Sequence, residues 1–430
     1  MQTLSTAPLA AFGFLDTKTV QPIAINHAEL KLNIGSTFTL TGAGIDILQS
    51  KITISAGKIY LCSMNASGEY LLNKDNISGY LNEFERYSDI NIDNSILKIS
   101  KDSSDRTGKM WIESDNITLN NSKLTATHHD NIGGDIYLFA KNNIVFENES
   151  KIITAATGES ITGKISINAK KIFFDNSGVS CHASHGAMAN DFEINAQEFF
   201  YMKDTVITAS AYGGSLNAAN INIQSTNVAL ENSTIKSETY ADVQGGNISF
   251  INAREIALKN SGITTESKSA SKNANGGNIQ MTGNIDNISL LDSTISTSVE
   301  NGIGNAGHIS IENAQSVVLN KSKIITQADE GYGGDIYIVS ETFIQSSDSL
   351  VDASSRLGVD GEVSISPDER VGQDLNDLTS KPLDHTKWLE KKCTQCSEKI
   401  TILSCINMLM VSLYHWMTGN PVRYCLFKLI

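Results

Sequence analysis

The sequence predicts an all-β fold, a right-handed parallel β-helix with a short non-repeat tail at its C-terminal end. Three observations predict this solenoid: a block of about 27 residues recurs along most of the chain, apolar and polar residues alternate within each block, and the blocks contain no proline. A fixed period of this size is typical of repeats that cannot bury an apolar face alone and therefore stack on their neighbours.

The recurring block reads roughly Gly-Gly-Asp/Asn-Ile-x-Ile, followed by two further alternating runs. Its clearest copies begin at Gly133, Gly245, Gly276 and Gly333. In the first of these copies the three runs are seen at residues 136–138, 144–146 and 152–154. Alternation with a period of two over a short run indicates a half-buried strand. We therefore expect three short strands in each coil, paired in parallel with the next coil, with columns of Ile, Leu, Val and Phe facing inward.

The distribution of proline is an independent indication of the same fold. The five prolines are Pro8, Pro22, Pro367, Pro382 and Pro421, so residues 23–366 contain none. Each interior strand of a β-helix hydrogen-bonds to a neighbour on both edges, and proline has no N–H to donate. A long proline-free stretch is therefore what a stack of interior strands requires.

Two kinds of dipeptide mark the corners between the runs. The first kind comprises Asn121-Ser122, Asn176-Ser177, Asn232-Ser233, Asn260-Ser261, Asp292-Ser293 and Lys321-Ser322. Asn tolerates the left-handed conformation of a tight corner, and small polar residues stacked in successive coils can form a hydrogen-bonded ladder. The Gly-Gly pairs predict a second corner, at which we expect a positive φ that glycine adopts without steric cost.

The repeat divides the chain into three segments. Residues 1–105 are expected to begin the β-helix, residues 106–370 to form its repeats, and residues 371–430 to be a non-repeat tail, disordered or partly helical. This tail is richer in Lys and Arg than in acids and holds four of the six cysteines. Its apolar run at 401–417 is interrupted by polar residues and falls short of a membrane span.

Composition excludes several classes of function. The net charge is −14 and no basic stripe runs along the sequence, which excludes nucleic acid as a partner. The first residues contain neither a basic nor an apolar region of the kind that forms a signal peptide. Cys62 and Cys181 are isolated within the repeats and do not predict a disulfide framework.

The candidate metal ligands are few. The histidine groupings in the repeats are His128-His129-Asp130 and Cys181-His182 with His185. A metal site needs a third and a fourth donor at matched spacing, and the next coil offers none in register, so we predict exposed residues in loops between copies. In the tail, Cys393, Cys396, Cys405 and His415 count as four donors. They lack the flanking pattern of a zinc knuckle, and we interpret them as ordinary thiols; no metal or cofactor is expected.

Catalysis is a candidate function because parallel β-helices include polysaccharide lyases and hydrolases. Such enzymes need two or three carboxylates on one face, with a base or bound calcium. The acids of this chain are scattered instead. Asp135 and Asp335 begin strands beside Gly-Gly, where we expect each carboxylate to accept hydrogen bonds from backbone donors at the corner. We predict no catalytic residue, no small-molecule substrate and no enzyme, with a β-helix polysaccharide lyase or hydrolase as the alternative.

Several segments also resemble a known family. They are residues 13–15, 23–25, 40–47 and 57–61, then the Gly-Gly-Asp/Asn-Ile repeats up to Ile338, and residues 351–355 and 361–365. The first group is similar to the later half of the secretion domain of filamentous-haemagglutinin-like exoproteins, and the repeats resemble the β-helical shaft of the same two-partner secretion family. The resemblance covers roughly residues 11–370, so that residues 1–105 correspond to a partial secretion domain.

The resemblance implies an adhesin, secreted or displayed on the cell surface after passage through a partner outer-membrane transporter. Its ligands would be host or neighbouring cell surfaces or glycans. Family members begin with a signal peptide and an N-terminal cap that contains Asn-Pro motifs, whereas the only Asn-Pro here is Asn420-Pro421 in the tail. We therefore expect Met1 to be an internal start. A non-functional truncated remnant of such an exoprotein is the second alternative.

One stretch between corners is longer than its equivalents. It spans residues 261–276 and is rich in Ser, Lys and Asn. Insertions of this kind emerge on one side of a solenoid and commonly form its recognition surface. The sequence assigns no individual ligand-binding residue.

Overall fold

The computed structural model describes residues 11–14, 22–64, 68–71, 87–100, 108–129, 133–271, 274–300, 302–366 and 370–371. All of them lie in the first of the two units into which the chain divides, Met1–Gly372 and Gln373–Ile430. The predicted tail, residues 371–430, lies outside the described residues apart from Val371.

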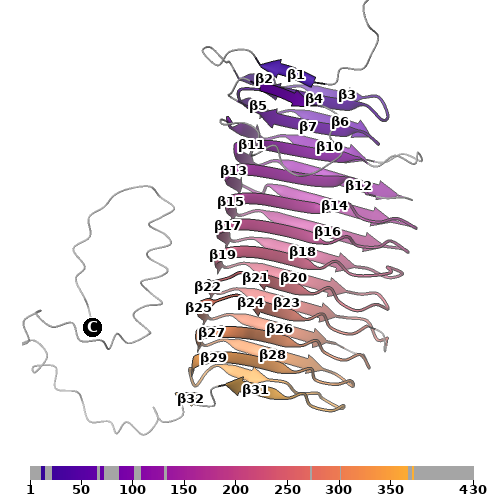
Figure 1. Cartoon of the computed structure of the whole chain (residues 1–430). Coiled ribbons are helices and arrows are strands. Elements are labelled where there is room, and N and C mark those ends of the chain that lie inside the picture. The colour runs from indigo at the N-terminus through magenta and orange to yellow at the C-terminus, as the bar shows by residue number, and fades with distance from the viewer. Residues whose placement is uncertain are drawn as a thin grey trace, which may run out of the picture. The chain divides into compact units, whose positions relative to one another are not determined.

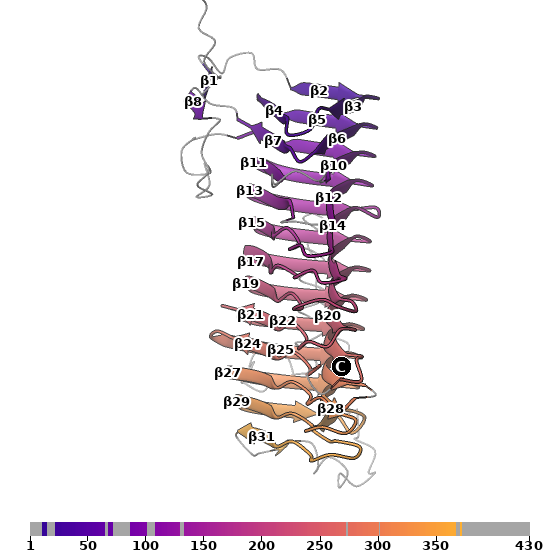
Figure 2. The ribbon, with the colours of Figure 1, turned by 90° about the vertical axis from the view of Figure 1, so that its right-hand side faces the viewer.

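The described residues form a parallel β-helix (Figure 1), and the fold class predicted from the sequence is confirmed. None of these residues is helical, and every pairing between their strands is parallel except that of β1 (Ala11–Phe14) with β8 (Gly68–Leu71). Two ladders of stacked strands, which we call the first and the second sheet, run the length of the solenoid (Figures 1 and 2).

The first sheet contains 12 strands, one from each coil. They are β3 (Glu29–Leu32), β6 (Lys51–Ser55), β10 (Ile96–Ser100), β12 (Lys123–His129), β14 (Lys151–Thr157), β16 (Gly178–Ser184), β18 (Val206–Ala211), β20 (Thr234–Thr239), β23 (Gly262–Ser267), β26 (Thr294–Val299), β28 (Lys323–Ala328) and β30 (Leu350–Asp352). Each strand corresponds to the third run of a repeat, as the sequence predicts.

The second sheet contains the first two runs of each repeat. Its strands are β2 (Ile23–Asn26), β4 (Thr37–Gly42), β5 (Ile45–Leu48), β7 (Lys58–Ser63), β9 (Ile90–Asp93), β11 (Lys109–Asn120), β13 (Asp135–Glu147), β15 (Ile165–Asp175), β17 (Phe192–Lys203), β19 (Ile221–Glu231), β21 (Ile248–Ile251), β22 (Glu255–Lys259), β24 (Ile279–Thr282), β25 (Ile285–Leu291), β27 (Ile309–Asn320), β29 (Ile336–Gln345), β31 (Val363–Ser366) and β32 (Arg370–Val371).

In many coils the first two runs are joined in one long strand. Strand β13, for example, pairs with β15 on both sides of a register shift between Phe139 and Asn143. The prediction of three short strands is therefore wrong for these coils. The polar residues at the bend keep the chain extended while its direction changes, so the bend does not end the strand. The runs remain separate in β21 and β22 and in β24 and β25.

The core consists of inward columns of aliphatic and aromatic side chains, as predicted. Ile152, Ile235 and Ile295 are fully buried at equivalent positions of the first sheet. In the second sheet the ring centroids of Phe146 and Phe174 lie 4.3 Å apart with an angle of 2° between their planes. Identical positions in adjacent coils thus pack on one another, which is why one repeated pattern suffices to specify a continuous core.

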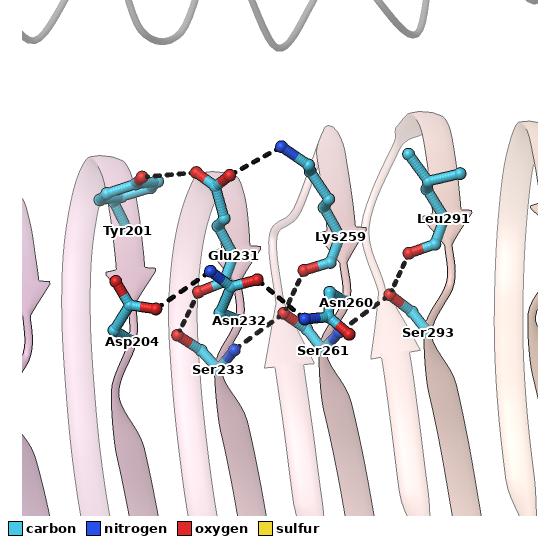
Figure 3. Close-up of polar contacts among 10 residues, drawn as sticks. All are labelled: Tyr201, Asp204, Glu231, Asn232, Ser233, Lys259, Asn260, Ser261, Leu291 and Ser293. Carbon is cyan, nitrogen blue, oxygen red and sulfur yellow. Dashed lines mark hydrogen bonds and ion pairs between the residues drawn. The ribbon is translucent and has the colours of Figure 1, made fainter.

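The predicted serine corner forms a hydrogen-bonded ladder (Figure 3). The backbone N–H of Thr205 donates to Ser233 Oγ at 3.2 Å, and that of Ser233 donates to Ser261 Oγ at 3.1 Å. Each hydroxyl donates in turn to the carbonyl two residues earlier, as Ser233 does to Glu231 at 2.7 Å. Asn232 has a φ of 49°, the left-handed conformation expected at this corner.

A second ladder of side chains runs beside the serines (Figure 3). Asn260 Nδ2 donates to Asn232 Oδ1 at 2.9 Å, and Asn232 Nδ2 donates to Asp204 Oδ1 at 3.0 Å. Lys259 Nζ lies 2.7 Å from Glu231 Oε1 one coil away. The corner is therefore tied between coils by both backbone and side-chain hydrogen bonds.

The Gly-Gly corner differs from its prediction. Among the four Gly-Gly pairs of the clearest repeats, only Gly334 has a positive φ, 76°. The requirement is instead the close approach of coils: a Cβ at Gly246 would lie 1.8 Å from the carbonyl oxygen of Ala219, and one at Gly307 would lie 1.9 Å from that of Gly277. Any larger residue would push neighbouring coils apart.

This steric requirement predicts a difference between two glycines. Gly307→Ala should lower the free energy of unfolding by about 1–3 kcal/mol, because the added methyl overlaps backbone that cannot move alone. Gly213→Ala is the matched control, since a Cβ there would meet nothing within 4 Å. Urea denaturation of both variants checks the prediction, and equal stabilities would contradict it.

Candidate binding surface

The loops that connect each first-sheet strand to the following second-sheet strand emerge on one side of the solenoid (Figure 1). We call this surface the loop side. Its described residues lie within 33–36, 56–57, 133–134, 158–164, 185–191, 212–220, 240–247, 268–278, 300–308, 329–335 and 353–362, without 272, 273 and 301, together with Gly108. The long stretch at 261–276 enters this surface after β23, on the side where the sequence predicts a recognition surface.

Exposed apolar side chains gather on the loop side. Of the 13 large apolar residues that are exposed in the described part of the chain, eight lie there: Ile34, Met188, Tyr212, Leu216, Tyr240, Ile303, Leu357 and Val359. Leu357 and Val359 are the most exposed, at 64% and 69%. Such side chains contribute nothing to the core and are available to a partner.

Four residues from successive coils form a row where the first sheet meets the loop side, which we call the tyrosine row. It consists of His182, Tyr212, Tyr240 and Lys268. The rings of Tyr212 and Tyr240 are stacked, with centroids 5.2 Å apart and an angle of 8° between planes. The ring centroids of His182 and Tyr212 lie 6.0 Å apart, and Lys268 Nζ lies 5.5 Å from the centroid of the Tyr240 ring.

Backbone hydrogen bonds between neighbouring coils set the positions of Tyr212, Tyr240 and Lys268 in this row. Tyr212, Tyr240 and Lys268 each follow directly on the last residue of a first-sheet strand. The ladder continues past the strand ends, because Tyr240 N donates to Ala211 O at 2.7 Å and Lys268 N donates to Thr239 O at 2.8 Å. The side chains are therefore held about one strand spacing apart, roughly 4.8 Å.

Carboxylates anchor the cationic end of the row. Lys268 Nζ lies 3.0 Å from Glu266 Oε2 and 3.3 Å from Glu238 Oε1, and Lys236 Nζ lies 3.1 Å from Glu238 Oε2. Burial alone would lower the pKa of Lys268, but hydrogen bonds and charges from Glu266 and Glu238 outweigh it and raise the pKa. Burial lowers the pKa of His182, so the imidazole is neutral at neutral pH. The row thus combines hydrogen-bond donors and acceptors.

The predicted histidine and cysteine groupings lie partly elsewhere than expected. Cys181 and His182 belong to strand β16 and not to a loop, so that prediction is wrong. The alternating burial of β16 turns Cys181 inward, with its thiol 3.3 Å from Thr162 Oγ1, and His182 outward. His185 is an exposed loop residue, as predicted.

Other candidates fall at the limits of the described structure. His128 and His129 end strand β12, but their side chains and Asp130 lie outside the described residues. Cys393, Cys396, Cys405 and His415 also lie outside them. Within the described part of the chain, no group of three or more His, Cys, Asp or Glu side chains is placed to hold a metal ion.

The two aspartates beside Gly-Gly have the role expected of them. Asp135 Oδ1 accepts from Lys164 N at 2.8 Å, and Asp335 Oδ1 accepts from Glu362 N at 2.9 Å. In other coils Asn takes the place of Asp and accepts the same kind of hydrogen bond, which the sequence analysis does not predict. For example, Asn278 N donates to Asn247 Oδ1 at 2.8 Å. The recurrent Asp/Asn after Gly-Gly is the sequence pattern that could have indicated it.

Comparisons with known proteins identify no relative of this chain. The chain matches no family model, no curated protein and no solved structure. A search of the described residues for membrane spans found no helix of sufficient length and apolarity. The strand pairing therefore establishes the parallel β-helix, while the family resemblance seen in the sequence stays a prediction.

Proposed function

We propose that this chain is a non-enzymatic, adhesin-like exoprotein, secreted or displayed at the cell surface, whose β-helix is a shaft for attachment. The observation that carries the proposal is the loop side, which presents exposed apolar and aromatic side chains from several coils. Binding residues on loops held by a rigid scaffold are a common arrangement for recognition. The target would be a host or neighbouring cell surface or its glycans.

The ladders make the shaft a suitable support for such contacts. Hydrogen bonds between coils at the serine corner, as from Ser233 N to Ser261 Oγ, fix the spacing of successive loops. Weak contacts at several loops then act together, because once one has formed the others are held at high effective concentration. Affinity would thus be spread along one side of the solenoid, without a deep pocket.

The route of export is part of the same proposal. The resemblance of residues 11–370 to two-partner secretion exoproteins supports passage through an outer-membrane transporter. Co-expression of the chain, fused behind a signal peptide, with a transporter of that family, followed by protease treatment of intact cells, tests this step. Protection of the chain from protease in cells that export a control exoprotein would count against it.

The attachment function is tested with purified chain coupled to fluorescent beads. We expect the beads to bind bacterial or animal cells in flow cytometry, and the double variant Leu357→Ser, Val359→Ser to reduce the bound fraction. The matched control is Val206→Ser, Leu350→Ser, which removes apolar residues of 46% and 44% exposure from the first sheet, away from the loops. Failure of the wild-type beads to bind any cell type contradicts the proposal, and release of reducing sugar from pectin or alginate contradicts its non-enzymatic part.

A further inference from the structure

We propose that the tyrosine row binds a neutral, extended glycan chain that lies along the axis of the solenoid. The inference rests on the proposed function for its biological role, since it names the ligand class and the place of attachment. The row itself is His182, Tyr212, Tyr240 and Lys268, with Glu266 beside it. Its geometry, polarity and charge each support this assignment.

The geometry favours contact through hydroxyl groups and ring edges. Tyr212 and Tyr240 are 41% and 40% exposed, yet each ring has one face against the other ring. The tilted ring of His182 lies beside Tyr212, with centroids 6.0 Å apart and an angle of 46° between planes, and Lys268 Nζ lies over the Tyr240 ring. What solvent reaches is therefore a pair of phenol edges at successive coils. The centroids of the two rings lie 5.2 Å apart, which is close to the length of one sugar unit in an extended chain, so successive hydroxyls can meet successive sugars.

The row is held in place before a ligand arrives. The ring of Tyr212 contacts those of His182 and Tyr240. The ring of Tyr240 also contacts the ammonium group of Lys268, which forms ion pairs with two carboxylates. Tyrosine loses few rotamers on binding, and an ordered side chain loses fewer still. A shallow exposed site gains affinity from this preorganisation.

Charge selects a neutral ligand. The ammonium groups of Lys236 and Lys268 are matched by the carboxylates of Glu238 and Glu266. The next position along the row after Lys268 is Glu300, which is exposed and pairs by its backbone N–H with Ser267 O at 2.9 Å. The chain as a whole carries −14. An anionic polymer would be repelled, whereas sugar hydroxyls can donate to the carboxylates and accept from the phenols.

Affinity electrophoresis in native gels tests the proposal, with hydroxyethyl cellulose, mixed-linkage β-glucan or galactomannan in the gel and heparin as the anionic comparison. We expect at least one neutral polymer to retard the wild-type chain and Tyr212→Ala, Tyr240→Ala to abolish the retardation. Tyr240→Phe keeps the ring stack and removes one hydroxyl, so it should raise Kd roughly fivefold to tenfold. Tyr337→Ala is the matched control, because Tyr337 is 49% exposed on β29 of the second sheet.

Circular dichroism and thermal melting establish that each variant is folded. The proposal is overturned if no neutral polymer retards the folded wild-type chain, if the double variant is retarded equally, or if only heparin binds. Beads that attach to cells while no neutral polymer binds would refute this site and leave the proposed function standing. If a neutral polymer binds but the beads attach to no cell type, the glycan site stands and the proposed attachment function is refuted.

Discussion

Replacing Phe174 with alanine should lower the free energy of unfolding by about 3–5 kcal/mol. The Phe174 side chain is fully buried and stacks on Phe146, with ring centroids 4.3 Å apart. It also makes an edge contact with Phe200, with centroids 6.2 Å apart and an angle of 75° between ring planes. The surrounding coils are fixed by hydrogen bonds on both sides, so they cannot collapse into the space left by the ring. Guanidinium denaturation monitored by circular dichroism measures the loss.

The neighbouring residue provides a matched control. Phe173 has the same chemistry but points outward, where it is half-buried and lies 5.9 Å from Phe199. Phe173→Ala should therefore lower the free energy of unfolding by less than half as much as Phe174→Ala does. Similar losses in the two variants would mean that the inward and outward faces of β15 are assigned wrongly.

The serine corner shows why so much of this fold is readable from the sequence. In a stack of coils, a residue meets the residue at the same place in the next repeat, so one local rule is applied many times. The φ of 49° at Asn232 and the hydroxyl of Ser233 satisfy the same needs as their counterparts at Asn260 and Ser261. A repeated dipeptide therefore predicts a corner and its ladder together.

The Gly-Gly corner shows what the sequence leaves open. Glycine is chosen both for positive φ and for close approach of backbones, and the residue type does not distinguish them. At Gly277 the reason is the carbonyl oxygen of Gly246, which would lie 2.1 Å from an added Cβ. That distance depends on how coils stack, and no local pattern encodes it.

The candidate surface was predictable only in part. Tyr212 and Tyr240 occupy equivalent places one repeat apart, so comparing repeats position by position could have found the pair. The anchoring of Lys268 by Glu238 comes from the preceding coil, 30 residues earlier, and follows from stacking alone. The prediction of a loop at Cys181 and His182 is wrong although the residues around them alternate as in a strand.

Introducing proline at Thr208 tests the hydrogen-bonded stack itself. Thr208 lies in the interior strand β18, in register with Ser180 of β16 and Lys236 of β20. Proline there removes an N–H of the ladder and places its ring against a neighbouring coil, so we expect a loss of at least about 3 kcal/mol. Because each coil contacts only its neighbours, the two halves of the solenoid should also uncouple and melt in separate or broadened transitions.

Thr208→Val separates this backbone effect from the loss of a side chain. Valine keeps the N–H and the branched shape, and it removes only the hydroxyl, which lies 3.1 Å from Ser210 Oγ. Its stability should stay within about 1 kcal/mol of the wild type, since one such hydrogen bond contributes little net free energy. A proline variant that melts in one transition at the wild-type temperature would show that β18 is not hydrogen-bonded on both edges. It would thereby refute the stacked parallel ladder on which both the shaft and the tyrosine row depend.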